Sequence, residues 1–200
     1  MYNRQIEDIP EEGTLLPETY HYTKNGSRPN IINQMSKAMT EALDILWPQR
    51  EEGLPFQTKE DAIILASIVE KETGIGLERA RVAGVFVNRL RLGMKLQSDP
   101  TVIYAITQGR IKNEGRGPLG RRLLKKDLAI QSPYNTYERT GLPPGPIANP
   151  GYASIQAVLH PEAHDFLYFV ADGDGGHAFA KTLSEHNRNV SKWRKIRNNM

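Results

Sequence analysis

Two carboxylic acids near the end of an apolar segment, Glu70 and Glu72, are the first candidates for acid–base chemistry in this sequence. The segment at 59–72 is predicted to form a helix, because Thr58 and Asp61 have the spacing of a capping box at its start. At about 100° per residue, apolar side chains surround almost the whole circumference of this helix. A helix that is apolar on all sides is expected to lie buried in the core.

The two glutamates point in different directions. Glu70 falls beside Ile63 and Ala66 on the helical wheel, whereas Glu72 lies about 160° away. Carboxylates on opposite faces cannot form the pair that most glycosidases use. A carboxyl group among apolar neighbours is desolvated, which raises its pKa toward the range that a general acid needs at neutral pH. This makes Glu70 a candidate general acid, but the helix by itself favours the alternative that Glu70 reaches solvent at the helix end or pairs with a neighbouring basic side chain.

Most other elements are also predicted to be helices, from the spacing of apolar positions and from start and stop signals. They cover residues 31–47, with Asn30 as the N-cap, residues 78–92, and residues 101–108, which follow the pair Asp99-Pro100. A similar pair of cap and proline, Asn149-Pro150, starts a helix that runs to about residue 160, and a basic helix follows the capping-box pair Thr182 and Glu185. The apolar run at 166–171 is predicted to be a buried strand, with a turn at 172–176 and a return strand at 177–181. Strands and helices do not alternate regularly, so the expected fold class is α+β: a helix-rich single domain with a small antiparallel hairpin near the C-terminus.

The composition narrows the function classes. The formal charge of +3 and the pI of about 9.1 fit an anionic partner and ordinary surface charge equally well. The absence of cysteine excludes disulfides, thiolate metal sites and a cysteine nucleophile. No apolar run approaches the roughly 20 residues that span a bilayer. The turn at 172–176 lacks the twelfth-position Glu of a calcium loop, because Leu183 stands there, so no metal site is predicted.

Several motifs occur in a fixed order along the chain. They are EKET at 70–73, VAGVFVNRL at 82–90, LQSDPTVIY at 96–104, YNTY at 134–137, GLPPGPIA at 141–148, HP at 160–161, YFVADG at 168–173, GGH at 175–177 and SEHN at 184–187. In this order and spacing, the set resembles the MltG (YceG-like) family of endolytic murein transglycosylases. Each motif alone is weak, whereas the ordered set is specific.

The resemblance implies an enzyme held in the inner membrane that faces the periplasm and cleaves the bond between N-acetylmuramic acid and N-acetylglucosamine in nascent strands. The family's catalytic glutamate is matched to Glu70, no cofactor is implied, and peptidoglycan synthases (penicillin-binding proteins) are expected among the partners. The family's transmembrane anchor and most of its LysM-like subdomain have no counterpart here. Residues 1–30 are therefore predicted to be a remnant of the joining region, and residues 31–200 the catalytic domain. The stretch at 113–123 looks longer than the family's usual loop.

One carboxylic acid is enough for this reaction. Protonated Glu70 would donate to the glycosidic oxygen, and its carboxylate would then take the proton from the muramic acid 6-hydroxyl, which attacks the anomeric carbon. The product is a 1,6-anhydro end. No water is activated, so the second carboxylate of the usual glycosidases is not needed.

The predicted substrate-binding residues lie in three segments. The first holds Gln97, Asp99 and Thr101, where Asp99 is either only the N-cap of the helix that follows or faces the sugar. The second is the run Tyr134, Asn135, Thr136 and Tyr137, which offers rings and hydrogen bonds, with a local turn as the alternative. The third comprises His177 and Asn187 near the C-terminus, with a structural role as the alternative.

Other functions remain open from the sequence. A non-catalytic glycan-binding module would keep the fold without a titrating carboxyl group. A pyridoxal-phosphate lyase would need a buried lysine for a Schiff base, and Lys71 is the helix candidate. Nucleic-acid binding by the basic C-terminal helix is the remotest of these, and no nucleic-acid partner is predicted.

Overall fold

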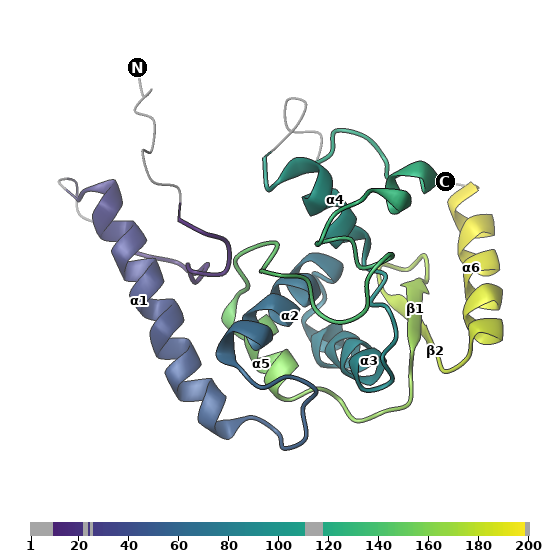
Figure 1. Ribbon diagram of the computed structural model, residues 1–200, viewed down its shortest axis with the longest axis horizontal. Coiled ribbons are helices and arrows are strands. Elements are labelled where there is room, and N and C mark those ends of the chain that lie inside the picture. Colours follow the sequence, from purple (N-terminus) through teal and green to yellow (C-terminus); the bar gives the residue numbers. More distant parts are fainter. Residues whose placement is uncertain (1–9, 22–23, 25, 111–117, 199–200) are drawn as a thin grey trace.

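The computed structural model describes residues 10–21, 24, 26–110 and 118–198. Residues 113–117 of the predicted long loop, and residues 1–9, 22–23 and 25 of the predicted N-terminal remnant, therefore lie outside the described residues. The described chain forms a helical core with a two-stranded sheet and a last helix at one side (Figure 1). This confirms the predicted α+β class.

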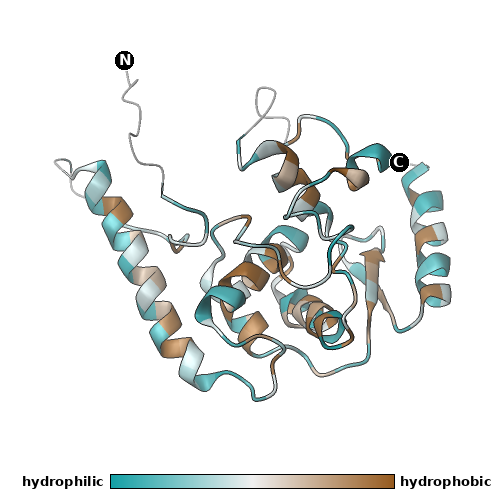
Figure 2. Ribbon diagram, viewed as in Figure 1, coloured by the Kyte–Doolittle hydropathy of each residue, from teal (hydrophilic) through white to brown (hydrophobic). Residues whose placement is uncertain are grey.

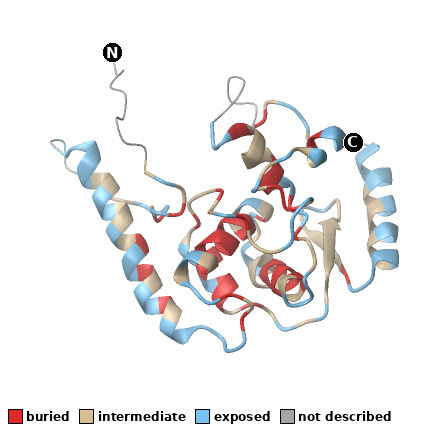
Figure 3. Cartoon of the chain, viewed as in Figure 1, coloured by how far each residue is buried: buried red, intermediate tan, exposed pale blue. Residues whose placement is uncertain are grey.

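Helix α2 (Lys59–Glu72) is the centre of the core. The capping box of Thr58 and Asp61 is present, as predicted, and every residue from 62 to 69 is buried. The helix packs against α5 (Tyr152–Leu159) and α3 (Arg79–Arg91). Figure 3 shows that the buried residues concentrate in these three helices. The prediction that α2 is buried all round is confirmed, and its C-terminal end brings both glutamates to the edge of the core.

Helix α1 (Arg28–Leu46) runs along the outside of the core and continues into the short 3-10 helix η1 (Trp47–Gln49) (Figure 1). Its apolar and polar residues alternate as on an amphipathic helix (Figure 2), and it buries Met39, Ala42 and Leu46. The preceding segment is tied to it, because the Leu16 backbone N–H donates to the Met35 carbonyl. The domain boundary at residue 30 stays a prediction.

Helix α3 packs tightly against the segment that leads to the sheet. A Cβ atom at Gly84 would lie 2.5 Å from the Glu162 carbonyl oxygen, so only glycine permits this approach. Asn88 Nδ2 donates to the carbonyls of His164 and Phe166, at 2.7 and 3.1 Å. These contacts fix the sheet beside the C-terminal part of α3.

The predicted hairpin is present as β1 (Tyr168–Ala171) and β2 (His177–Ala180), paired antiparallel with Phe169 opposite Phe179. The strand β1 was expected to be buried, but its four residues are only half-buried. In the described chain the sheet has two strands, so each strand keeps one unpaired edge, and α6 (Leu183–Asn198) contacts both strands. The 3-10 helices η2 (Gly76–Glu78) and η3 (Lys125–Ala129) complete the described elements.

Three predicted helix starts are wrong. Helix α1 begins at Arg28, with Ser27 rather than Asn30 at the N-cap position. Helix α4 (Asp99–Thr107) begins at Asp99 itself, with Ser98 at the N-cap position, so Asp99 is not the cap. Helix α5 begins at Tyr152, because the Asn149 side chain accepts a hydrogen bond from the Leu15 N–H at 3.0 Å. For α4 and α5, a tertiary contact takes the polar side chain that the sequence assigned to local capping.

Candidate acid–base site

Glu72, the last residue of α2, is the carboxyl group around which the predicted site residues gather. Ser98 Oγ donates to Glu72 Oε1 at 2.6 Å. Burial raises the pKa of Glu72 to about 7, and the charge of Asp99 adds to this rise. The hydrogen bond from Ser98 opposes it, as do His177 when its ring is protonated and the positive charge of Arg89. A carboxyl group with this pKa exchanges its proton near neutral pH.

Glu70 has a different environment. Its Oε2 accepts hydrogen bonds from the Gly151 N–H at 3.2 Å and from Ser154 Oγ at 2.6 Å. Gly151 is the N-cap residue of α5, so this carboxylate lies at a helix N-terminus, where a negative charge is stabilised. Among the described residues, these are the hydrogen-bond donors to Glu70. The geometry gives Glu70 a role in joining α2 to α5.

The loop before α4 and the loop at 134–137 lie against each other beside Glu72. Tyr137 Oη donates to Asp99 Oδ1 at 2.6 Å, and burial, followed by this bond, raises the pKa of Tyr137. Gln97 donates its N–H to the Thr136 carbonyl, and its side chain is exposed. The φ angle of Gln97 is 51°, a left-handed conformation that is uncommon outside glycine and often found at functional sites. Gln97, Asp99 and Tyr137 therefore border the site.

Three other predicted residues support these loops. Thr101 and Thr136 are buried, and their hydroxyl oxygens lie 2.8 Å apart. Asn135 is also buried and donates to the carbonyls of Leu128 and Ile130, both at 2.9 Å. The predicted local turn is present here, because Asn135 Oδ1 accepts the Tyr137 N–H. These side chains are fully engaged within the protein.

Tyr134 packs against a neighbouring ring. Its ring centroid lies 4.9 Å from that of Tyr104 in α4. The Tyr134 hydroxyl lies against the backbone of Gly145, where an added Cβ would be 3.0 Å away. This ring joins α4 to the proline-rich loop.

Arg89 is a buried cation that the sequence analysis did not single out. Its Nε donates to the Leu167 carbonyl at 2.6 Å, and its Nη1 donates to the Leu96 carbonyl at 2.8 Å. The guanidinium also lies 5.1 Å from the centre of the Tyr168 ring. Arg89 thus joins α3, β1 and the loop before α4 around Glu72. The motif at 82–90 contains this arginine, but nothing local marks it as buried.

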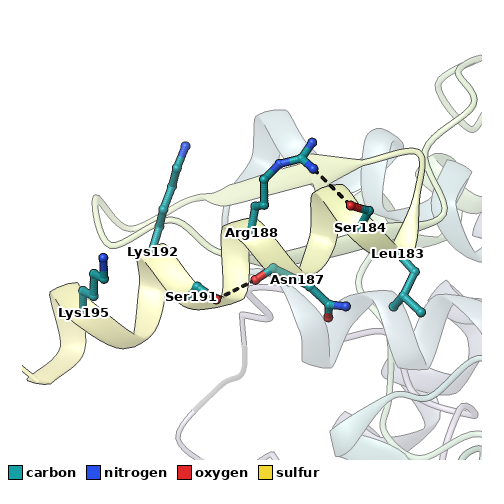
Figure 4. A pocket seen from close by; sticks show the side chains of 7 residues that line it. All are labelled: Leu183, Ser184, Asn187, Arg188, Ser191, Lys192 and Lys195. Carbon is teal, nitrogen blue, oxygen red and sulfur yellow. Dashed lines mark hydrogen bonds between the residues drawn. The ribbon is translucent and has the colours of Figure 1, made fainter.

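The two substrate-binding residues predicted near the C-terminus, His177 and Asn187, lie in different places. His177 lies at the start of β2, near enough to Glu72 for a protonated His177 ring to act on that carboxyl group. Asn187 is exposed on α6, and it lines a shallow groove with six other residues of that helix (Figure 4). The structure therefore brings His177, but not Asn187, to the Glu72 site.

Two negative findings concern the described residues alone. Within 10–21, 24, 26–110 and 118–198, no cluster of three or more His, Asp or Glu side chains is placed to hold a metal ion. None of the helices in that part of the chain has the length and hydropathy to cross a membrane.

Lys71 is exposed, so it does not have the desolvated environment of a Schiff-base lysine.

The chain is similar to known proteins in both sequence and structure. The sequence pattern of the YceG-like family matches residues 2–192. The chain belongs to the YceG-like family. The crystal structure of the YceG-like protein lmo1499 from Listeria monocytogenes is similar, with a TM-score of 0.70 and 39% identity over 88% of this chain and 54% of that one.

Two relatives carry a functional name. An endolytic murein transglycosylase of Bacillus subtilis (strain 168) is 40% identical over 194 residues, which are 96% of this chain and 50% of that protein. An endolytic murein transglycosylase of Streptococcus pneumoniae (strain ATCC BAA-255 / R6) is 35% identical over 188 residues, which are 90% of this chain and 32% of that protein. This YceG-like chain spans half or less of the length of these named relatives.

Proposed function

We propose that this chain is the catalytic part of an endolytic peptidoglycan transglycosylase and that Glu72 is its single acid/base. The observation that carries the proposal is the half-buried Glu72 carboxyl group, whose pKa is raised to about 7 beside Ser98 and Asp99. The names of its relatives support the substrate class. Glu72 replaces Glu70, the residue that the sequence favoured, because Glu70 is engaged at the start of α5.

The proposed reaction uses the two protonation states of Glu72 in turn. The protonated carboxyl group donates to the glycosidic oxygen as the bond between N-acetylmuramic acid and N-acetylglucosamine breaks. The resulting carboxylate takes the proton of the muramic acid 6-hydroxyl as its oxygen bonds to the anomeric carbon. Because that proton restores Glu72, each cycle ends with a 1,6-anhydro product and the starting enzyme.

The residues that border the site are suited to hold a sugar. Gln97 is exposed and lies next to the loop at 134–137, and Tyr137 carries a ring and a hydroxyl group. We propose that Gln97, Asp99, Tyr137 and His177 contact the glycan, and that Tyr134, Asn135, Thr101 and Thr136 hold these loops in place. Asn187 is left without a role at this site.

The setting of the reaction belongs to the same proposal. A peptidoglycan substrate implies action on the outer side of the cytoplasmic membrane, in the periplasm where there is one. An inner-membrane anchor and penicillin-binding proteins as partners are part of the longer enzyme that the family resemblance implies. This part of the proposal concerns the whole protein.

A pair of matched variants tests the assignment. Uncrosslinked glycan strands are incubated with the wild type, Glu72→Gln or Glu70→Gln, and the products are identified by mass spectrometry. We expect anhydro-ended fragments from the wild type and from Glu70→Gln, and none from Glu72→Gln. Reducing ends in place of anhydro ends would refute the mechanism. An active Glu72→Gln with an inactive, folded Glu70→Gln would return the role to Glu70.

A further inference from the structure

A second carboxylate beside the site, Glu78, holds His177 by two hydrogen bonds. Glu78 ends η2, the short 3-10 helix that follows α2, and His177 begins β2. Glu78 Oε1 accepts the His177 backbone N–H at 3.1 Å, and Oε2 lies 2.7 Å from His177 Nδ1. The side chains of Glu78 and His177 are only 16% and 17% exposed. This contact between distant segments is therefore largely shielded from water.

The surroundings fix both partners of this pair. A Cβ at Gly176 would lie 3.0 Å from Glu78 Oε1 and 2.9 Å from Asp172 Oδ2, so glycine lets the turn approach the carboxylate. The His177 ring meets Phe169 edge-on, with centroids 5.3 Å apart and an interplanar angle of 89°. The imidazole therefore has one orientation, set by a carboxylate on one edge and an aromatic ring on another.

The hydrogen bond at Nδ1 decides which nitrogen of His177 carries the proton. A carboxylate only accepts hydrogen bonds, so Nδ1 donates to Glu78. In the neutral ring, Nε2 is then unprotonated and acts as an acceptor. Among the described residues, the His177 side chain makes one hydrogen bond, which joins Nδ1 to Glu78. Its Nε2 has no hydrogen-bond partner there.

We propose that Glu78 is a positioning residue that keeps His177 in the Nδ1–H form, and that His177 Nε2 accepts a hydrogen bond from a hydroxyl group of the glycan bound at Glu72. The inference rests on the proposed function for the identity of the ligand. The arrangement of an orienting carboxylate, an imidazole and a free Nε2 is the one by which serine hydrolases hold their histidine. The rigid pair orients the sugar next to Glu72.

The tautomer is tested without any substrate. The nitrogen-15 and proton spectra of the full chain distinguish Nδ1–H from Nε2–H imidazoles, and the signal that disappears in His177→Asn is that of His177. We expect the Nδ1–H form in the wild type and a shift toward Nε2–H in Glu78→Gln. The side-chain amide in Glu78→Gln can donate its N–H to His177 Nδ1. Its oxygen can still accept the His177 backbone N–H. An Nε2–H signal from His177 in the wild type would overturn the proposal.

Kinetics test the role of Nε2. His177→Asn keeps a donor for Glu78 but lacks Nε2, whereas His177→Gln keeps a polar atom near Nε2 but lacks the bond to Glu78. We expect His177→Asn to melt near the wild type and to lose about tenfold in kcat/KM, the effect of one hydrogen bond to substrate. Glu78→Gln should lose a similar factor, because Nε2 then presents a proton. If His177→Asn had the same kcat/KM as the wild type, the proposal would be overturned.

The outcomes separate this inference from the proposed function. If the wild type makes no anhydro products, the proposed function fails, and the spectra still decide the tautomer that Glu78 imposes. If the wild type is active and Glu72→Gln is not, but both His177→Asn and Glu78→Gln are fully active, only the role of the pair is refuted.

Discussion

The pKa of Glu72 makes a quantitative prediction about stability. Burial of this carboxyl group raises its pKa from 4.5 to about 7 on folding. The folded state therefore binds more protons than the unfolded state between these two values, and the wild type must lose stability as pH rises through this window. At about 1.4 kcal/mol for each pH unit, this difference in pKa corresponds to a loss of about 3 to 3.5 kcal/mol. Residual contact with water makes this an upper limit.

The variant Glu72→Gln removes this penalty, because an amide does not ionise in either state. Its side-chain oxygen can still accept the hydrogen bond from Ser98. The free energy of unfolding of the variant minus that of the wild type should therefore grow by about 2 to 3 kcal/mol between pH 4 and pH 8. All other titrating groups are common to both proteins and cancel in this difference.

Urea unfolding, followed by circular dichroism at several pH values, measures this difference. The matched control is Glu70→Gln, which makes the same chemical change on the same helix. Glu70 accepts hydrogen bonds from Gly151 and Ser154, so its replacement measures the effect of exchanging a carboxylate for an amide on α2 away from Ser98 and Asp99. A difference for Glu72→Gln that stays level from pH 4 to pH 8 would refute the reasoning that this carboxyl group is desolvated.

Three further substitutions follow from the same contacts. Ser98→Ala removes a hydrogen bond that lowers the pKa of Glu72, so the alkaline limb of the pH–activity profile should move to higher pH. Asp99→Asn removes a charge that raises this pKa, so the limb should move to lower pH; shifts in the same direction would contradict this account. Gly84→Ala places a methyl group 2.5 Å from the Glu162 carbonyl and should cost about 1 to 3 kcal/mol, measured as a lower midpoint in urea. An unchanged midpoint would show that α3 moves without cost.

Much of the fold follows from local signals in the sequence. Capping residues, apolar spacing and the turn at 172–176 predict α2, α3, the hairpin and α6 close to their observed bounds. The misplaced starts of α4 and α5 have one cause. A cap is judged from its neighbours in sequence, whereas Asp99 and Asn149 bond to Tyr137 and Leu15 across the fold.

The sequence by itself determined the family, the buried helix and the presence of two glutamates at its end. It did not determine what surrounds each glutamate, because a helix that is apolar all round does not show which segments pack against each of its faces. Only the tertiary structure distinguishes their surroundings, since it places α5 against Glu70 and the loop with Ser98 against Glu72. The desolvation that raises the pKa of Glu72 comes from those distant segments, and no spacing along the chain encodes it.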